Sequence, residues 1–199
     1  MTDKPVLEFW FEFASTYSYP AAMRVEEVAG AAGVAVVWRP FLLGPIFQSQ
    51  GWDNSPFNIY PAKGAYMWRD MERVCEAQDI PFQRPTAFPR NGLLAARVSF
   101  ACAEEPWLPA FVRSVYAANF SEDMDISDVG VIGALLAGQG QAPEPILEVA
   151  QTPENKEALK NQTLQAKENG LFGAPSFVVG EELFWGNDRL EQAVDWATR

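Results

Sequence analysis

The sequence contains no histidine, and its two cysteines, Cys75 and Cys102, stand far apart within helix-like apolar patterns. The absence of histidine excludes Ser-His-Asp and Cys-His nucleophiles and removes the commonest metal ligand, so we predict no metal site. No C-x-x-C pair is present, which leaves dithiol redox chemistry and a zinc knuckle without support. We therefore expect Cys75 and Cys102 to be reduced residues of the core.

Basic residues are scarce, since 15 Lys and Arg stand against 26 Asp and Glu, for a formal net charge of -11. Binding to a phosphate backbone needs clustered cations, so we expect no nucleic-acid partner. A small anionic ligand would need local donors to hold it. No stretch is long and apolar enough to span a membrane, and no basic, apolar signal segment precedes the first predicted strand. We therefore expect a soluble cytoplasmic protein with no membrane partner.

The N-terminal stretch combines a strand pattern with the start of a helix. Large apolar residues alternate with others over Leu7–Phe13, which is typical of a strand. Ser15, Thr16 and Ser18 are candidate caps of a helix whose apolar pattern continues through Val28. The N-terminus of a helix is electropositive and favours a nearby anion. The Ser15 hydroxyl would stand in this field, and the alternative is that Ser15 only caps the helix.

The remaining elements follow in an order that predicts the fold. A second strand over 34–38 completes a β-α-β unit, and residues 45–150 read as a helical block, with an irregular loop over 51–63 and a proline-punctuated connector over 81–89. A polar helix, two strands joined by a turn, and a last helix capped by 186–188 then complete the chain. This order is the α/β thioredoxin-like arrangement with a helical domain inserted between its β-α-β and β-β-α halves. It predicts one domain of residues 1–44 and 151–199 and an inserted domain of residues 45–150.

Pro175 opens a strand-like run that ends at Val179. Because proline cannot donate a hydrogen bond to a sheet, Pro175 should lie at an edge or follow a cis bond. If the Ala174–Pro175 bond is cis, the N–H and C=O groups of Ala174 face outward and can pair with an extended ligand. An ordinary trans proline at the start of a strand is the alternative.

Five spaced motifs resemble the 2-hydroxychromene-2-carboxylate isomerase family, which shares a DsbA-like thioredoxin fold with kappa-class glutathione transferases. The motifs are Phe13–Tyr19, Asn54, Pro61–Gly64, Phe172–Pro175 and Trp185–Leu190. Together they span nearly the whole chain. The S-P-Y-S motif that is usual in the family is replaced by Ser15-Thr16-Tyr17-Ser18. We expect this change to keep the Ser15 hydroxyl in place and to loosen the turn.

The resemblance implies a glutathione-dependent interconversion of 2-hydroxychromene-2-carboxylate and trans-o-hydroxybenzylidenepyruvate in aromatic catabolism. Ser15 would hold the glutathione thiolate, and Lys63 would join it in stabilising the developing charge. Asn54 and Lys63 would close over the glycine end and the substrate. The remaining glutathione contacts would be made by Ala174, Pro175, Asn187 and Asp188, with the last two holding the γ-glutamyl group.

Other interpretations of these residues remain open. Asn187 and Asp188 are equally consistent with a plain helix cap, Asn54 with a loop residue and Lys63 with a solvated side chain. Candidates for binding the substrate carboxylate are Arg69, Arg90 and Arg97. Tyr17, Trp10 and Trp185 are candidate walls of an aromatic pocket, and each could equally be a core residue. A kappa-like glutathione S-transferase and a non-catalytic thioredoxin-fold binding module are the alternative functions. A homodimer is compatible with the family.

Overall fold

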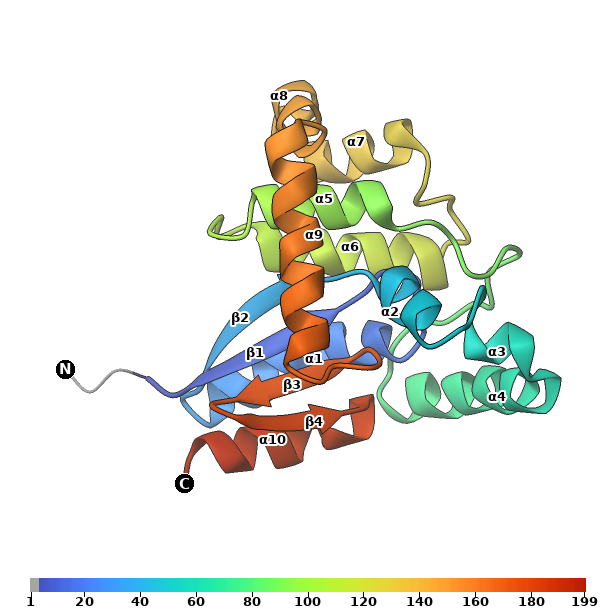
Figure 1. Cartoon of the computed structure of the whole chain (residues 1–199), viewed down its shortest axis with the longest axis vertical. Coiled ribbons are helices and arrows are strands. Elements are labelled where there is room, and N and C mark those ends of the chain that lie inside the picture. Colours follow the sequence, from blue (N-terminus) through green and yellow to red (C-terminus); the bar gives the residue numbers. More distant parts are fainter. Residues whose placement is uncertain (1–3) are drawn as a thin grey trace.

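A four-stranded sheet, in the order β2-β1-β3-β4, forms the centre of the computed structural model, which describes residues 4–199 (Figure 1). Its strands are β1 (Val6–Phe11), β2 (Ala35–Pro40), β3 (Ser176–Val179) and β4 (Glu182–Trp185). β1 pairs parallel with β2 and antiparallel with β3, and β3 and β4 form an antiparallel hairpin. Residues 1–3 of the predicted first domain lie outside the described part of the chain.

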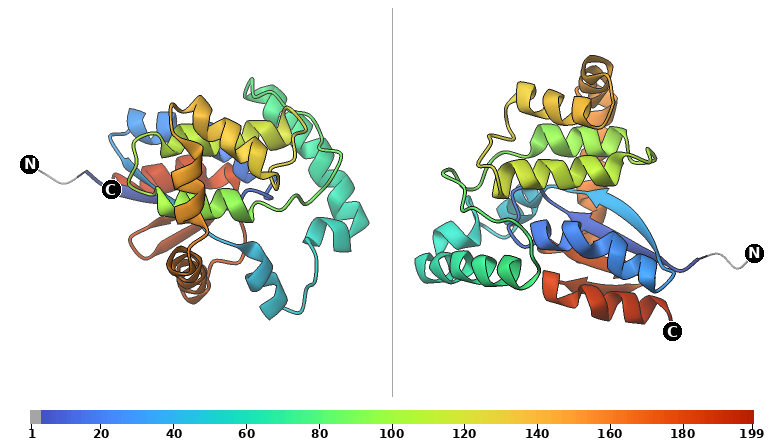
Figure 2. Two further views of the ribbon diagram at one scale, coloured as in Figure 1. Left: turned by 90° about the horizontal axis from the view of Figure 1, so that it is seen from above. Right: turned by 180° about the vertical axis from the view of Figure 1, so that it is seen from behind.

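Most of the helices lie around this sheet in three groups, with α2 and α9 outside them. α1 (Ser18–Ala31) joins β1 to β2 and packs beside α10 (Leu190–Ala197) on the face seen from behind in Figure 2. α5 to α8 stack at one end of the sheet, whereas α3 and α4 lie to one side of it (Figures 1 and 2). The bounds of the other helices are α2 (Leu43–Ser49), α3 (Pro56–Ile59), α4 (Pro61–Ala77), α5 (Leu93–Ala101), α6 (Leu108–Phe120), α7 (Val129–Gly138), α8 (Pro143–Ala150), α9 (Pro153–Glu168) and the 3-10 turn η1 (Asn187–Arg189).

Aromatic residues of β1 build the core on both faces of the sheet. Phe9 stacks on Phe177 at 5.5 Å between ring centroids and belongs to a large cluster that continues into the helical block. Trp10 points to the opposite face, where it is buried in a smaller cluster with Phe41. Of the two interpretations left open for Trp10, the structure therefore supports the core residue and not the pocket wall. The sheet and the helical block share one hydrophobic core, which marks no boundary between them. The division of the chain at residues 44 and 151 therefore stays a prediction.

The segment predicted as an irregular loop over 51–63 contains all of α3 and the start of α4. The Ser55 hydroxyl accepts a hydrogen bond from the Phe57 N–H at 3.3 Å and caps α3. Pro56 and Pro61 each stand at the beginning of a helix. Proline is compatible with this position, because its fixed φ suits the first turn and its missing N–H would have no partner there. The two prolines therefore start helices within a segment that we predicted to be an irregular loop.

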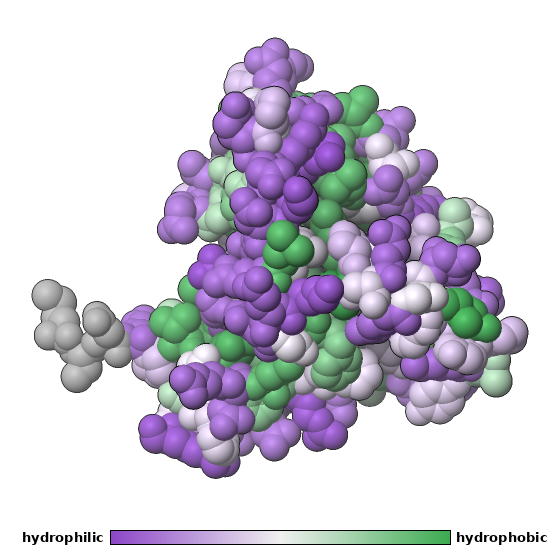
Figure 3. All heavy atoms as spheres, in the orientation of Figure 1, coloured by the Kyte–Doolittle hydropathy of each residue, from purple (hydrophilic) through white to green (hydrophobic). Residues whose placement is uncertain are grey.

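The surface of the molecule is largely hydrophilic on the face that Figure 3 shows, with polar side chains gathered over α9. The predicted polar helix over 153–169 is thus confirmed as α9, and Thr152 caps it by accepting from the Asn155 N–H. Among residues 4–199, no helix combines the length and apolar character needed to cross a membrane.

Candidate functional site

A cavity of about 870 Å³ lies where the β1–α1 turn faces the segment between β2 and α4 and the loops around β3 and β4. It brings together the seven residues predicted for catalysis and glutathione binding, although these come from five separate parts of the chain: Ser15, Asn54, Lys63, Ala174, Pro175, Asn187 and Asp188. Tyr17 and Trp185 line the same cavity, as predicted. Within the described range, no cluster of three or more His, Cys, Asp or Glu side chains is placed to hold a metal ion.

Ser15 lies in a tight turn ahead of α1 rather than at its cap. α1 begins at Ser18, and no side chain caps its first turn, so the prediction of hydroxyl caps was wrong. The Ser15 N–H donates to the Glu12 carbonyl at 3.0 Å, which closes the turn. The Ser15 hydroxyl is then directed across the cavity floor and donates to the Ala174 carbonyl at 2.8 Å. Two of the five motifs that carry the resemblance therefore touch through this hydrogen bond.

Thr16 anchors this turn, in contrast to the expectation that it would loosen it. Its side chain is 1% exposed, and its hydroxyl donates to the Met67 sulfur of α4 at 3.1 Å. The neighbouring Tyr17 hydroxyl donates to Asp70 of the same helix at 2.9 Å. Two side chains of the turn are therefore tied to α4, which also carries Lys63.

The Ala174–Pro175 peptide bond is cis, which decides between the cis and trans alternatives that the sequence left open. We expected the Ala174 carbonyl to face an extended ligand. It instead accepts a hydrogen bond from the Ser15 hydroxyl and is not free. The Ala174 N–H has no protein acceptor within residues 4–199 and lines the cavity. The Pro175 carbonyl accepts from the Gly186 N–H at 2.9 Å and so fixes the following loop against the cis bond.

Asn187 and Asp188 form the start of η1, and neither side chain makes a capping hydrogen bond. Asn187 is 7% exposed, and its Oδ1 atom has no hydrogen-bond partner among the described residues. The Asp188 side chain is 73% exposed and lies 3.4 Å from the Arg189 guanidinium. The cap interpretation is therefore wrong for both residues, and the exposed Asp188 carboxylate is available to a ligand, whereas the Asn187 Oδ1 atom is buried.

Asn54 and Lys63 lie on the wall formed by α3 and α4. The Asn54 Oδ1 atom accepts from the Ser55 N–H at 2.7 Å and from Asn58 at 3.0 Å, which ties Asn54 to the start of α3. Lys63 is exposed in the first turn of α4, and its Nζ lies 5.6 Å from the centre of the Phe57 ring. Lys63 is therefore a cation at the rim of the cavity.

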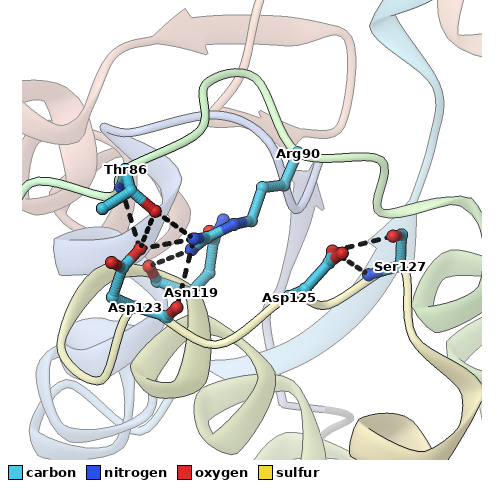
Figure 4. Close-up of polar contacts among 6 residues, drawn as sticks. All are labelled: Thr86, Arg90, Asn119, Asp123, Asp125 and Ser127. Carbon is cyan, nitrogen blue, oxygen red and sulfur yellow. Dashed lines mark hydrogen bonds and ion pairs between the residues drawn. The ribbon is translucent and has the colours of Figure 1, made fainter.

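The three arginines proposed for a substrate carboxylate are not available to one. Arg69 pairs with Glu72 on the surface of α4, and neither Arg69 nor Arg97 lines the cavity. Arg90 lines it, but its guanidinium is turned into a buried network (Figure 4). The acceptors in this network are the Asn119 carbonyl and side chain, the Thr86 hydroxyl and the Asp123 carbonyl and carboxylate.

Glu12 was missed from the sequence, where it stood as one polar residue of an alternating strand. It lies directly after β1 and lines the cavity, and its Oε2 atom accepts from the Ala14 N–H at 2.9 Å. Burial raises the pKa of the Glu12 carboxyl group to about 7, although hydrogen bonds from the Ala14 and Ser15 N–H groups lower it. No local pattern reports this environment, because it is made by segments distant in sequence.

The pKa of Glu12 predicts a dependence of stability on pH. Because the folded pKa of about 7 lies above the ordinary value of 4.5, the folded protein holds this proton more tightly than the unfolded chain. The stability that the folded protein gains from holding this proton is complete below the unfolded pKa of 4.5, and it is lost as the pH rises through about 7. In urea unfolding, Glu12→Gln should flatten the decline of the unfolding free energy over this range, and an identical decline in the variant would contradict the assignment.

Comparisons with known proteins agree with this architecture. The family model of the DSBA-like thioredoxin domain matches residues 6–196. The chain is 26% identical over 187 residues to a 2-hydroxychromene-2-carboxylate isomerase of Sphingobium xenophagum, covering 93% of this chain and 94% of that relative. It is 27% identical over 199 residues to glutathione S-transferase kappa 1 of Homo sapiens, covering 93% and 87%.

A solved structure of a 2-hydroxychromene-2-carboxylate isomerase superimposes with a TM-score of 0.87 at 22% identity, covering 96% of this chain and 93% of that one. The family match spans both halves of the sheet and the helices between them. The predicted thioredoxin-like fold is thereby confirmed, and the chain belongs to the DsbA-like thioredoxin domain family.

Proposed function

We propose that this protein is a glutathione-dependent isomerase that interconverts 2-hydroxychromene-2-carboxylate and trans-o-hydroxybenzylidenepyruvate. The observation that carries the proposal is the meeting of all seven predicted site residues on one cavity, with the Ser15 hydroxyl bonded to Ala174 at its floor. The names of the relatives at 26% and 27% identity support the two parts of the proposal, isomerisation and the use of glutathione.

The residues present fit glutathione at three points. The unpaired Ala174 N–H suits the cysteinyl backbone, and the exposed Asp188 carboxylate suits the γ-glutamyl ammonium group, with Asn187 beside it on the cavity wall. Pro175 would pack against the cysteinyl part. The glycine end would then extend toward Asn54 and Lys63, where the Lys63 ammonium can meet its carboxylate.

When bound, glutathione would supply a thiolate nucleophile for reversible addition to the ring-opened enone. Ser15 donates its hydroxyl hydrogen to the sulfur, which requires it to release the Ala174 carbonyl. Lys63 stabilises the negative charge that develops on the substrate oxygen, and it is the cavity cation that no carboxylate of residues 4–199 neutralises. Tyr17 and Phe57, at 6.3 Å between ring centroids, provide aromatic walls for the substrate.

The proposal is tested by adding 2-hydroxychromene-2-carboxylate to the purified protein with and without glutathione. We expect the benzylidenepyruvate to form only when both protein and glutathione are present. Accumulation of a stable glutathione adduct would favour the kappa-like transferase instead. Binding of glutathione without any turnover would favour the non-catalytic binding module.

Removal of the Asp188 carboxylate is expected to weaken glutathione binding. Loss of one charge-assisted hydrogen bond in Asp188→Ala should raise the dissociation constant by about tenfold, because such a bond contributes roughly 1.5–3 kcal/mol and water can replace part of it. Isothermal titration calorimetry measures the constant, and Glu181→Ala, an exposed acid outside the cavity, is the matched control. Unchanged affinity in Asp188→Ala would move the γ-glutamyl group elsewhere.

A further inference from the structure

One acidic side chain of the cavity, Glu12, has no part in the reaction described so far. Glu12 and Ser15 are the two ends of one tight turn, joined by the hydrogen bond from the Ser15 N–H to the Glu12 carbonyl at 3.0 Å. Both residues line the cavity. The Glu12 carboxyl group accepts from the Ala14 N–H and forms no ion pair with any cation of residues 4–199. An acid without a counter-charge therefore stands beside the proposed position of the thiol.

The backbone around Glu12 is held in place from α6. The Tyr116 hydroxyl donates to the Glu12 carbonyl at 2.9 Å, and the Asn119 amide donates to the Phe13 carbonyl at 3.2 Å. Arg90 in turn donates to Asn119 (Figure 4). Burial raises the pKa of Tyr116 well above its usual value, so this hydroxyl stays protonated and remains a donor. Glu12 is thus fixed relative to Ser15.

The other charged side chains of the cavity are engaged or exposed. Asp70 accepts from the Tyr17 hydroxyl and from Arg73, and Tyr17 stays protonated because burial, followed by the bond to Asp70, raises its pKa well above the usual value. Four charged groups of the cavity remain. Arg90 pairs with Asp123, and Asp188 lies near Arg189. Asp53 and Lys63 are exposed. Glu12 therefore differs from the other acids of the cavity.

We infer that Glu12 is the base that accepts the thiol proton when glutathione binds, an inference that rests on the proposed function. In this step the S–H bond breaks, an O–H bond forms on the Glu12 carboxyl group, and both electrons of the broken bond remain on sulfur. The total charge of the site is unchanged. Without histidine the chain offers few other acceptors, since a serine hydroxyl is a weak base and a lysine ammonium has no lone pair.

The pKa of about 7 suits Glu12 to this role, because a base that works at neutral pH should have a pKa close to the operating pH. At its ordinary value of 4.5 the carboxylate would return the proton to the thiolate much more readily. Once the proton is on Glu12, the negative charge lies on sulfur, where the Ser15 hydroxyl stabilises it.

The test counts the protons released to the buffer as glutathione binds at about pH 8, by calorimetry in buffers of different ionisation enthalpy, with the thiolate absorbance recorded in parallel. In the wild-type protein we expect thiolate absorbance with almost no proton release, because the negative charge of the neighbouring thiolate raises the pKa of Glu12 further and the carboxyl group keeps the proton. In Glu12→Gln, which retains an oxygen to accept from the Ala14 N–H, we expect thiolate absorbance with release of roughly 0.8 proton per glutathione.

Two further variants complete this test. Glu12→Ala should give the same proton count as Glu12→Gln, which keeps the result independent of how well one variant folds. Glu8→Gln should match the wild type, since Glu8 pairs with Arg39 outside the cavity. Equal proton release in the wild type and Glu12→Gln, with thiolate in both, would overturn the role of Glu12 and leave the proposed function standing. The absence of thiolate in the wild type would overturn both.

Discussion

Ser15→Ala is expected to lower the rate of glutathione-dependent isomerisation by at least about tenfold and up to about a thousandfold, since the loss of one preorganised donor costs roughly a hundredfold to a thousandfold. The hydroxyl lies at the floor of the cavity, where it donates to the Ala174 carbonyl at 2.8 Å. Its removal takes a donor from the thiolate and also breaks the contact between the β1–α1 turn and the cis-proline loop. Initial rates at saturating glutathione measure the loss.

Ser114→Ala is a suitable control for this variant. The Ser114 hydroxyl also donates to a backbone carbonyl, that of Phe111, at 2.8 Å, but it lies on α6 outside the cavity. We expect its turnover to match that of the wild type. If Ser15→Ala were as active as Ser114→Ala, Ser15 would have no part in the mechanism.

Arg90→Ala is expected to lower the free energy of unfolding by about 3 kcal/mol, because it leaves buried acceptors without a donor. Arg90 is 8% exposed and donates to both the carbonyl and the side chain of Asn119 at 3.2 Å. For a chain of this length the melting temperature should fall by about 6–12 °C. Thermal and urea unfolding both measure this change.

The matched control replaces an arginine of similar chemistry on the surface. Arg69 pairs with Glu72 one helical turn away, and both side chains are largely exposed. Arg69→Ala should change the stability by no more than about 0.5 kcal/mol, since water replaces an exposed ion pair at little cost. Equal stability of Arg90→Ala and Arg69→Ala would show that the network in Figure 4 contributes nothing.

The strands and their faces were predictable because a strand has a period of two. The alternation around Trp10 places Phe9 and Phe11 in the main core and Trp10 in the smaller cluster on the opposite face. The helices that begin at Pro56 and Pro61 were not predictable from composition, because proline breaks a helix internally and starts one at its first position.

The candidate site was predictable where motifs carried it and hidden where distant contacts decide the chemistry. Ser15 and Ala174 were found from separate motifs, yet their hydrogen bond depends on how the sheet joins β1 to β3. The engagement of Arg90 by Asp123 and the burial of Glu12 likewise arise from contacts between segments far apart in the chain. A residue's type in the sequence does not report such neighbours.

The most direct test of the central proposal is the ultraviolet absorbance of the thiolate as glutathione is titrated into the wild-type protein and into Ser15→Ala at neutral pH. We expect the wild type to develop thiolate absorbance that saturates with binding, and Ser15→Ala to bind glutathione with little or none. Equal thiolate absorbance in both proteins, or none in the wild type, would contradict the role of the Ser15 hydroxyl in holding a glutathione thiolate.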